Sequence, residues 1–162
     1  DAIVNAANSK LLSCFVPNHS CIDNAIHTAT GVELRLACQE LMQEQGEDEA
    51  TGQAKMTKAF NLPSRYVLHT VGPIIYDEVT DLERQQLASS YEECLNLAYE
   101  KGLRSLAFCC ISTGEFRFPN EEAAKIAIET VLQFQKEHPD MVVIFNVFKD
   151  IDYTIYQALL KK

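Results

Sequence analysis

The 162-residue sequence has no tryptophan and is poor in the residues that interrupt regular structure, with 6 glycines and 5 prolines. This scarcity excludes a collagen-like or low-complexity chain. Positive charge is also scarce, because 14 lysines and arginines face 23 acidic residues and leave a formal net charge of -9. Bulk nucleic-acid binding is therefore not expected, and a phosphate-bearing ligand would have to be held by local backbone donors.

Long apolar runs are missing as well. No segment approaches the roughly 18 consecutive apolar residues that a membrane span requires, and the first residues do not form a secretion signal. We therefore expect a cytoplasmic protein without membrane contact.

Six cysteines could make three disulfides, but Cys109 and Cys110 are adjacent in an apolar run and Cys38 and Cys94 fall in helical patterns. Reduced thiols fit this pattern better.

The order of apolar and amphipathic segments predicts an α/β fold within one domain, residues 1–162. The near-continuous apolar character of the strands suggests helices on both faces of the sheet. Strands are predicted at 2–7, 54–60, 65–72, 105–111 and 141–148. Helices are predicted at 22–45 with a break at Gly31, at about 81–101, at about 120–137 with Asn120 as cap, and from Ile151. The chain opens directly into a buried-looking strand, which suggests a fragment of a longer protein.

The segment Asn5–Ser9, "NAANS", lies at the carboxyl end of the first predicted strand, the edge where open α/β sheets place ligands. The amides of Asn5 and Asn8 could hold sugar hydroxyls there. The simpler interpretation is that these residues only shape a turn after the strand.

Three preferred zinc ligands follow in one loop: Cys14, His19 and Cys21. His19 and Cys21 are two apart and can point the same way in an extended stretch, while Cys14 can join them across the turn at Pro17. Three protein ligands with an open fourth position are typical of a catalytic zinc site. The spacing is not a zinc-finger signature, however, so a chance meeting of two thiols and an imidazole, or a Cys14–Cys21 disulfide, stays open.

Asp23 opens the helix that follows the loop. A carboxylate is favoured at this position by capping and by the helix dipole, so capping alone would explain it. The functional alternative is that Asp23 faces the cleft and orients or activates a water molecule. We expect His27, one turn later, to be a satisfied packing residue, and His69 to be structural because it lies in a buried strand.

A last segment, "ISTGEFRFP", joins a predicted strand to a predicted helix. Its backbone N–H groups could cradle a diphosphate, and Gly114 permits close approach. Phe116 could stack against a sugar or base, whereas Phe118 suits the core. A plain strand-to-helix connection is the alternative.

Taken together, "DAIVNAANS", "IDNAIH", "TGQAKMTKAFNLPSRYVLHTVGP" and "AFCCISTGEFRFP" resemble the macrodomain family in order and spacing, from Asp1 to about Glu137. The resemblance implies a three-layer α/β/α fold with a central mixed sheet that binds ADP-ribose, and an N-terminal part that is missing here. The family's Gly-rich stretch is replaced by "LLSCFVPNHSCIDNAIH", which resembles the zinc-dependent bacterial branch. In that branch the corresponding Cys, His and Cys bind zinc beside the distal ribose.

Further roles follow from the resemblance. It implies that Asn8 bonds the distal ribose, that Asp23 lies near the scissile anomeric carbon, and that Phe116 covers the distal ribose. It also implies that the family's adenine-recognising Asp precedes Asp1. The loop over the diphosphate would consist of Ser112, Thr113, Gly114, Glu115 and Phe116.

The expected activity is zinc-dependent hydrolysis of the glycosidic bond that links mono-ADP-ribose to a modified protein, with Zn²⁺ as a Lewis acid that orients the substrate. Three alternatives remain: a module that binds ADP-ribose without cleaving it, an O-acetyl-ADP-ribose deacetylase, and a purely structural zinc. The resemblance also suggests a sirtuin-type ADP-ribosyltransferase as functional partner and a lipoyl-carrier protein as target.

Overall fold

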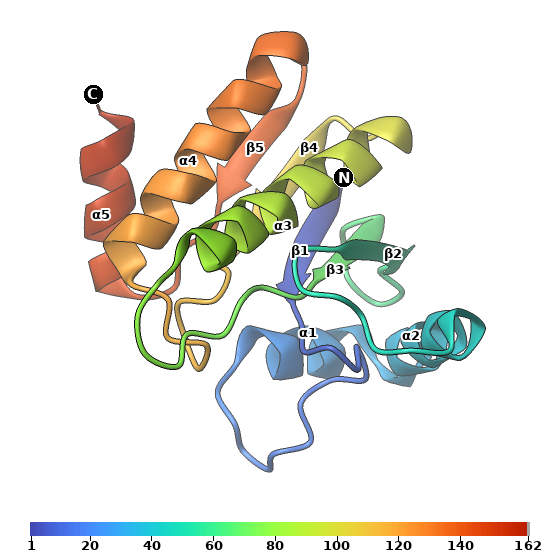
Figure 1. The fold of residues 1–162 in the computed structure, drawn as a ribbon. Helices are drawn as coiled ribbons and strands as arrows, with labels where there is room; N and C mark the ends of the chain where they lie inside the picture. The colour runs from blue at the N-terminus through green and yellow to red at the C-terminus, as the bar shows by residue number, and fades with distance from the viewer. Residues whose placement is uncertain (162) are drawn as a thin grey trace.

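The computed structural model describes residues 1–161, in which a five-stranded sheet lies between helices (Figure 1). Across the sheet the strands follow the order β2-β3-β1-β4-β5. β2 is antiparallel to β3, and the other neighbours are parallel, so the sheet is mixed as predicted. The strands are β1 (Ala2–Ala6), β2 (Ala54–Lys58), β3 (Tyr66–Thr70), β4 (Ser105–Phe108) and β5 (Val142–Phe145).

Five helices connect and cover these strands. The predicted break at Gly31 is confirmed, because this residue has a φ of 95° and ends one helix directly before the next begins. Such a positive φ is accessible to glycine at little steric cost. The helices are α1 (Ile22–Thr30), α2 (Val32–Gln45), α3 (Asp81–Glu100), α4 (Asn120–Glu137) and α5 (Asp150–Leu160).

Two hydrophobic clusters, one on each face of the sheet, make this a three-layer α/β/α fold. Ala2 and Val4 of β1 pack into the larger cluster, together with apolar residues of α3, α4 and α5. Ile3 and Ala7 point the other way, into a smaller cluster built largely by α1 and α2. This alternation is the side-chain period of a strand buried on both faces.

Two details differ from the sequence-based predictions. β5 is not covered on both faces by the described residues, since Val142 and Ile144 remain 57% and 52% exposed. Asn120 is not a helix cap, because Pro119 holds the cap position of α4. The Asn120 amide instead donates to Asp152 Oδ1 at 2.6 Å and so ties α4 to α5.

The parallel strands β1, β3 and β4 end at one edge of the sheet, and the long loop before α1 lies beside that edge (Figure 1). Asn5 of β1 lies directly opposite His69 of β3 in the register. This edge is where open α/β sheets bind ligands. Within residues 1–161, no helix combines the length and the apolar character needed to cross a membrane.

Candidate active site

The loop between β1 and α1 carries the predicted metal ligands and is anchored at two points. Leu11 is fully buried in the smaller hydrophobic cluster. Farther along, the guanidinium of Arg35 on α2 lies 4.9 Å from the ring centre of Phe15, within range of a cation–π contact. The loop therefore has a defined path over α1 and α2.

Cys14, His19 and Cys21 converge at the end of this loop. Their ligand atoms all lie within 4.8 Å of one another, and Cys14 Sγ is 3.1 Å from His19 Nδ1. Tetrahedral zinc bonds to sulfur and nitrogen would separate such atoms by about 3.5 Å, so only a small adjustment is needed. The donor set and its spacing fit zinc, whose binding stays a prediction.

The pKa values within this group differ for physical reasons. The pKa of the Cys14 thiol is lowered, first by the Val16 backbone N–H and then by His19 and Cys21. Desolvation raises the pKa of Cys21, and the charge of Asp23 adds to this effect. The backbone N–H of Asn24 also donates to Cys21 Sγ at 3.4 Å, a bond that favours the thiolate.

Asp23 is not the cap of α1. That position belongs to Cys21, whose Sγ accepts from Asn24, and Asp23 lies one residue inside the helix. Its side chain is turned inward and is only 4% exposed. Burial raises the pKa of its carboxyl group, while a hydrogen bond donated by Asn5 Nδ2 at 2.8 Å partly offsets this shift. The capping explanation is therefore wrong, although Asp23 does lie in the first turn of α1, where the helix dipole favours a carboxylate. The dipole does not explain why this carboxylate is buried beside the predicted metal ligands.

The two asparagines of "NAAN" have different surroundings. Asn5 is fully buried, with Asp23 and His69 as its partners, so its amide holds neighbouring side chains and does not project from the edge of the sheet. Asn8 is half-buried, and its amide binds the loop at the Ser13 carbonyl and the Lys10 N–H. Both asparagines thus shape the site, and contact of either with a sugar stays a prediction.

His27 was expected to be a satisfied packing residue, and the structure confirms the packing but not the satisfied hydrogen bonds. The ring is buried, but neither of its nitrogens has a hydrogen-bond partner among the described residues. Nε2 lies 3.5 Å from Asp23 Oδ1, too far for a strong bond. Burial lowers the pKa of His27 to about 4, so the imidazole is neutral at pH 7 and stands next to the buried carboxylate.

The loop after β4 turns sharply where a diphosphate cradle is predicted. Ser112 has a φ of 64°, and its buried hydroxyl lacks a hydrogen-bond partner within residues 1–161. Thr113 Oγ1 donates to the Cys110 carbonyl, and the N–H of Arg117 donates to the Gly114 carbonyl. Phe118, by contrast, is buried in the core as expected.

This loop contacts the loop between β1 and α1 through Glu115. Its Oε1 atom lies 3.4 Å from His19 Nε2, on the side of the ring opposite to the nitrogen that faces Cys14. The pKa of His19 is raised, first by Cys14 and then by Glu115. The arrangement leaves Nδ1 for a metal and Nε2–H for a carboxylate, the usual pattern around a ligating histidine.

Gly72, just after β3, packs tightly against the loop after β4. A Cβ atom there would lie 2.1 Å from Ser112 Oγ and 2.6 Å from Ile111 Cγ2. We expect Gly72→Ala to destabilise the protein by about 1–3 kcal/mol, because overpacking forces the loop to shift. Thermal unfolding followed by circular dichroism measures this as a lower Tm.

Gly114→Ala is the matched control in the same loop. Gly114 has nothing within 4 Å of the position of an added Cβ, so this variant should keep the wild-type Tm. Equal Tm values for the two variants would contradict the tight packing at Gly72.

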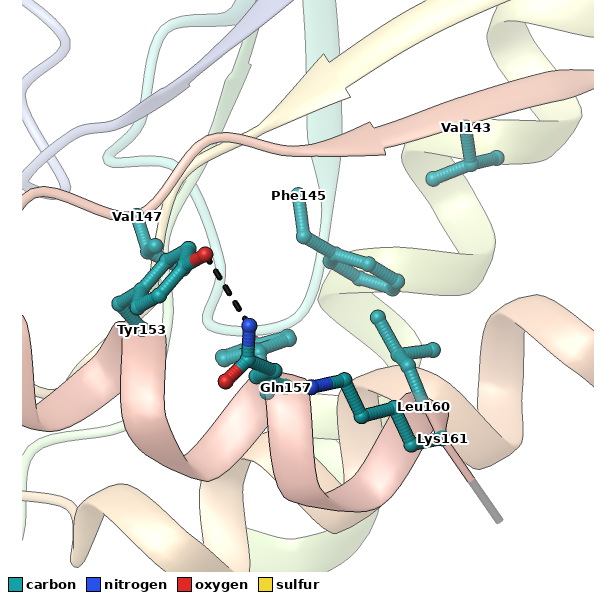
Figure 2. Close-up of a pocket in the computed structure, with 8 residues that line it drawn as sticks. Val143, Phe145, Val147, Tyr153, Gln157, Leu160 and Lys161 are labelled. Atoms are coloured by element: carbon teal, nitrogen blue, oxygen red, sulfur yellow. Dashed lines mark hydrogen bonds between the residues drawn. The ribbon is translucent and has the colours of Figure 1, made fainter.

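A hollow of about 380 Å³ lies elsewhere, between β5 and α5 (Figure 2). Its walls are mainly apolar, and Gln157 Nε2 donates to Tyr153 Oη at 3.1 Å across one side. Among the described residues that line it there is no carboxylate, thiol or imidazole, so we place the chemistry at the sheet edge. Its walls consist of Val143, Phe145, Val147, Tyr153, Tyr156, Gln157, Leu160 and Lys161.

Comparison with known proteins gives consistent matches. The Macro domain family profile matches residues 4–127. The chain is 56% identical over 161 residues to a protein-ADP-ribose hydrolase of Treponema medium, covering 99% of this chain. It is 51% identical over its whole length to a protein of the same name from Staphylococcus aureus (strain MRSA252). The chain spans 62% of the length of each of these relatives.

The fold has similar solved structures as well. An Oceanobacillus iheyensis macrodomain with ADP superposes with a TM-score of 0.90 at 43% sequence identity. The match covers 99% of this chain and 82% of that chain. The predicted fold is thus confirmed both by its own architecture and by a close structural relative.

Proposed function

Since the chain belongs to the macrodomain family, we propose that it removes ADP-ribose from modified proteins by hydrolysis, assisted by zinc held on Cys14, His19 and Cys21. One observation carries this proposal. The buried Asp23 carboxylate lies two residues from Cys21, one of three convergent candidate metal ligands, at the sheet edge where the loop proposed to bind the diphosphate also lies. A carboxylate, three convergent ligands and a loop of backbone donors supply the parts that such a hydrolysis needs.

The roles proposed for these residues follow from the charge that develops on the substrate during hydrolysis. Hydrolysis breaks the bond between ribose C1 and the acceptor side chain, forms a bond from C1 to the oxygen of water, and builds positive charge on the sugar ring. The Asp23 carboxylate can stabilise that charge and accept a proton from the attacking water, and the departing acceptor group takes up a proton in turn. Asn5 holds that carboxylate in one orientation. Zinc, when bound, would supply Lewis acidity toward an oxygen of the substrate.

Binding of the diphosphate is assigned to residues 112–116. The protein has a net charge of -9, so a local loop, and not an overall positive field, must attract the phosphates. Backbone N–H groups in a sharp turn form such a pocket for anions.

The function is tested by incubating the protein with an ADP-ribosylated protein and measuring both products by mass spectrometry. We expect free ADP-ribose together with an acceptor protein restored to its unmodified mass. ADP-ribose that binds with no change in the mass of the modified acceptor would contradict hydrolysis and indicate a binding module. The same assay tests the proposed partners. A lipoyl-carrier protein, modified beforehand by a sirtuin-type ADP-ribosyltransferase, serves as the ADP-ribosylated substrate.

Glu115 supports zinc binding through His19, so Glu115→Gln is expected to weaken zinc affinity by about 10- to 100-fold. The amide accepts the His19 N–H less strongly than a carboxylate does and orients the ring less well. Competition with a chromophoric chelator measures the zinc Kd.

The control is Glu100→Gln, which removes the same charge from the exposed end of α3, near the start of β4 and so at the opposite edge of the sheet. It should keep the wild-type zinc Kd. A Glu115→Gln variant with that same Kd would show that the contact does not support the metal.

A further inference from the structure

Buried polar side chains continue from Asp23 into the core along the junction of β1 and β3. Asn5 Nδ2 lies 2.8 Å from Asp23 Oδ1 and 3.2 Å from His69 Nδ1. On the other side of the imidazole, His69 Nε2 lies 3.0 Å from Thr57 Oγ1. Asn5 and His69 are both 0% exposed, so water cannot replace any of these bonds.

Counting protons fixes the direction of every bond in this row. The Asn5 amide nitrogen has two N–H groups, and the structure directs one at Asp23 and the other at His69. His69 Nδ1 must therefore accept, which places the single ring proton on Nε2, where it donates to Thr57. Burial lowers the pKa of His69 to about 3, so the ring is neutral at physiological pH.

We propose that His69 is a positioning residue whose Nδ1 lone pair fixes the Asn5 amide and, through it, the orientation of the Asp23 carboxylate. Without this acceptor only the bond to Asp23 would restrain the amide, and its second N–H would be left buried without a partner. The amide, and the Asp23 carboxylate bound to it, could then turn away from the orientation that the two bonds together hold. The proposal rests on the proposed function only in so far as Asp23 acts on the substrate.

A metal-binding role of His69 can be distinguished from this positioning role. His27, Cys38 and His69 are buried, and their ligand atoms lie within 4.8 Å of one another, as in a metal site. The nitrogen of His69 nearest to Cys38 Sγ is Nε2, at 3.7 Å. A metal there would take the Nε2 lone pair and move the ring proton to Nδ1, against the N–H of Asn5. The ring nitrogen that carries the proton, Nε2 or Nδ1, therefore distinguishes the positioning role of His69 from a metal-binding role.

The first test is the tautomer of His69 in the wild-type protein, read from long-range ¹H–¹⁵N NMR spectra of the imidazoles. We expect a neutral ring protonated at Nε2, unchanged between about pH 5 and 8 because the ring titrates far below that range. A ring protonated at Nδ1, or one that becomes charged in this range, would overturn the proposal.

The second test compares two substitutions. His69→Leu removes the acceptor, whereas the amide oxygen of His69→Asn can lie near the former Nδ1 atom. We expect kcat to fall on the order of 10²-fold in His69→Leu, because a misplaced reacting group loses near-attack geometry. KM and zinc content should stay near wild type, and His69→Asn should regain most of the lost kcat. Equal kcat in both variants, or wild-type kcat in His69→Leu, would overturn the positioning role.

Thr57→Val is the milder variant if His69→Leu fails to fold. It keeps the side-chain shape and removes the acceptor of the Nε2 proton. We expect a several-fold lower kcat with an unchanged KM and a population of the other tautomer. If the tautomer of His69 and kcat both stayed unchanged, the hydrogen bond from His69 to Thr57 would not help to position Asn5 and Asp23.

A structural measurement separates failure of this proposal from failure of the proposed function. In a crystal structure of His69→Leu, or of Thr57→Val if that variant is used, we expect the Asn5 amide and the Asp23 carboxylate to be displaced from their wild-type positions. This result holds even if the wild-type protein releases no ADP-ribose, an outcome that would refute hydrolysis alone. An unmoved Asn5 and Asp23 would refute the positioning role alone.

Discussion

Replacing Cys14 with alanine is expected to abolish zinc binding and hydrolysis together. Cys14 Sγ lies 3.1 Å from His19 Nδ1, and its thiol has the lowered pKa that favours a thiolate ligand. A metal ion contributes several kcal/mol to stabilising charge in a transition state, which corresponds to about a 10³-fold lower rate when it is lost. Elemental analysis and the initial rate of ADP-ribose release, measured on the same preparation, test this.

Cys110→Ala is the matched control for Cys14→Ala. Cys110 is another half-buried free thiol, and it lies outside the group of convergent ligands. This variant should keep both zinc and hydrolysis. If Cys14→Ala lost zinc and melted at a lower temperature yet kept the wild-type rate, the zinc would be structural and the proposed mechanism would be wrong.

Asp23→Asn is expected to keep zinc and lose most turnover. The substitution keeps the size of the side chain and an oxygen that can accept from Asn5, but it removes the negative charge and the basic site. Loss of a positioned general base lowers kcat by about 10²- to 10⁴-fold. Single-turnover kinetics together with zinc analysis separate this effect from metal loss.

The control for Asp23→Asn is Asp150→Asn, which removes an exposed carboxylate from the first turn of another helix. It reproduces the small loss of helix-dipole stabilisation without touching the site. We expect wild-type kcat in this control. Comparable rates for the two variants would mean that Asp23 matters only for its helix.

The elements of the fold were predictable because their signals are local. Apolar runs and helical periodicity located the five strands and five helices, and Gly31 marked the break between α1 and α2. The uncovered face of β5 was not predictable in this way. An apolar strand has the same composition whether or not a helix covers both of its faces, as Val142 and Ile144 illustrate.

The site was predictable as a set of residues but not as a set of roles. The spacing of Cys14, His19 and Cys21 indicated their convergence, which the structure contains. The helix start at Asp23 suggested a cap, yet Cys21 holds that position and the carboxylate turns inward. One residue of register decides between these roles, and helix boundaries read from sequence are uncertain by more than that.

The role of His69 could not be predicted from the sequence. Its position in an apolar strand suggested a structural residue, because the partner that defines its role lies on another strand 64 residues away. The available signal was that Asn5 and His69 are both polar residues inside apolar strands. Buried polar groups of this kind need hydrogen-bond partners, and the parallel register of β1 and β3 supplies one for the other.

The role of zinc is tested most directly by following bound zinc and the initial rate of ADP-ribose release in one sample, while a chelator is added and zinc is then restored. We expect the rate to fall in proportion to the zinc removed and to recover when zinc returns. A full rate of release from protein that has been emptied of zinc would contradict zinc-assisted hydrolysis at Cys14, His19 and Cys21.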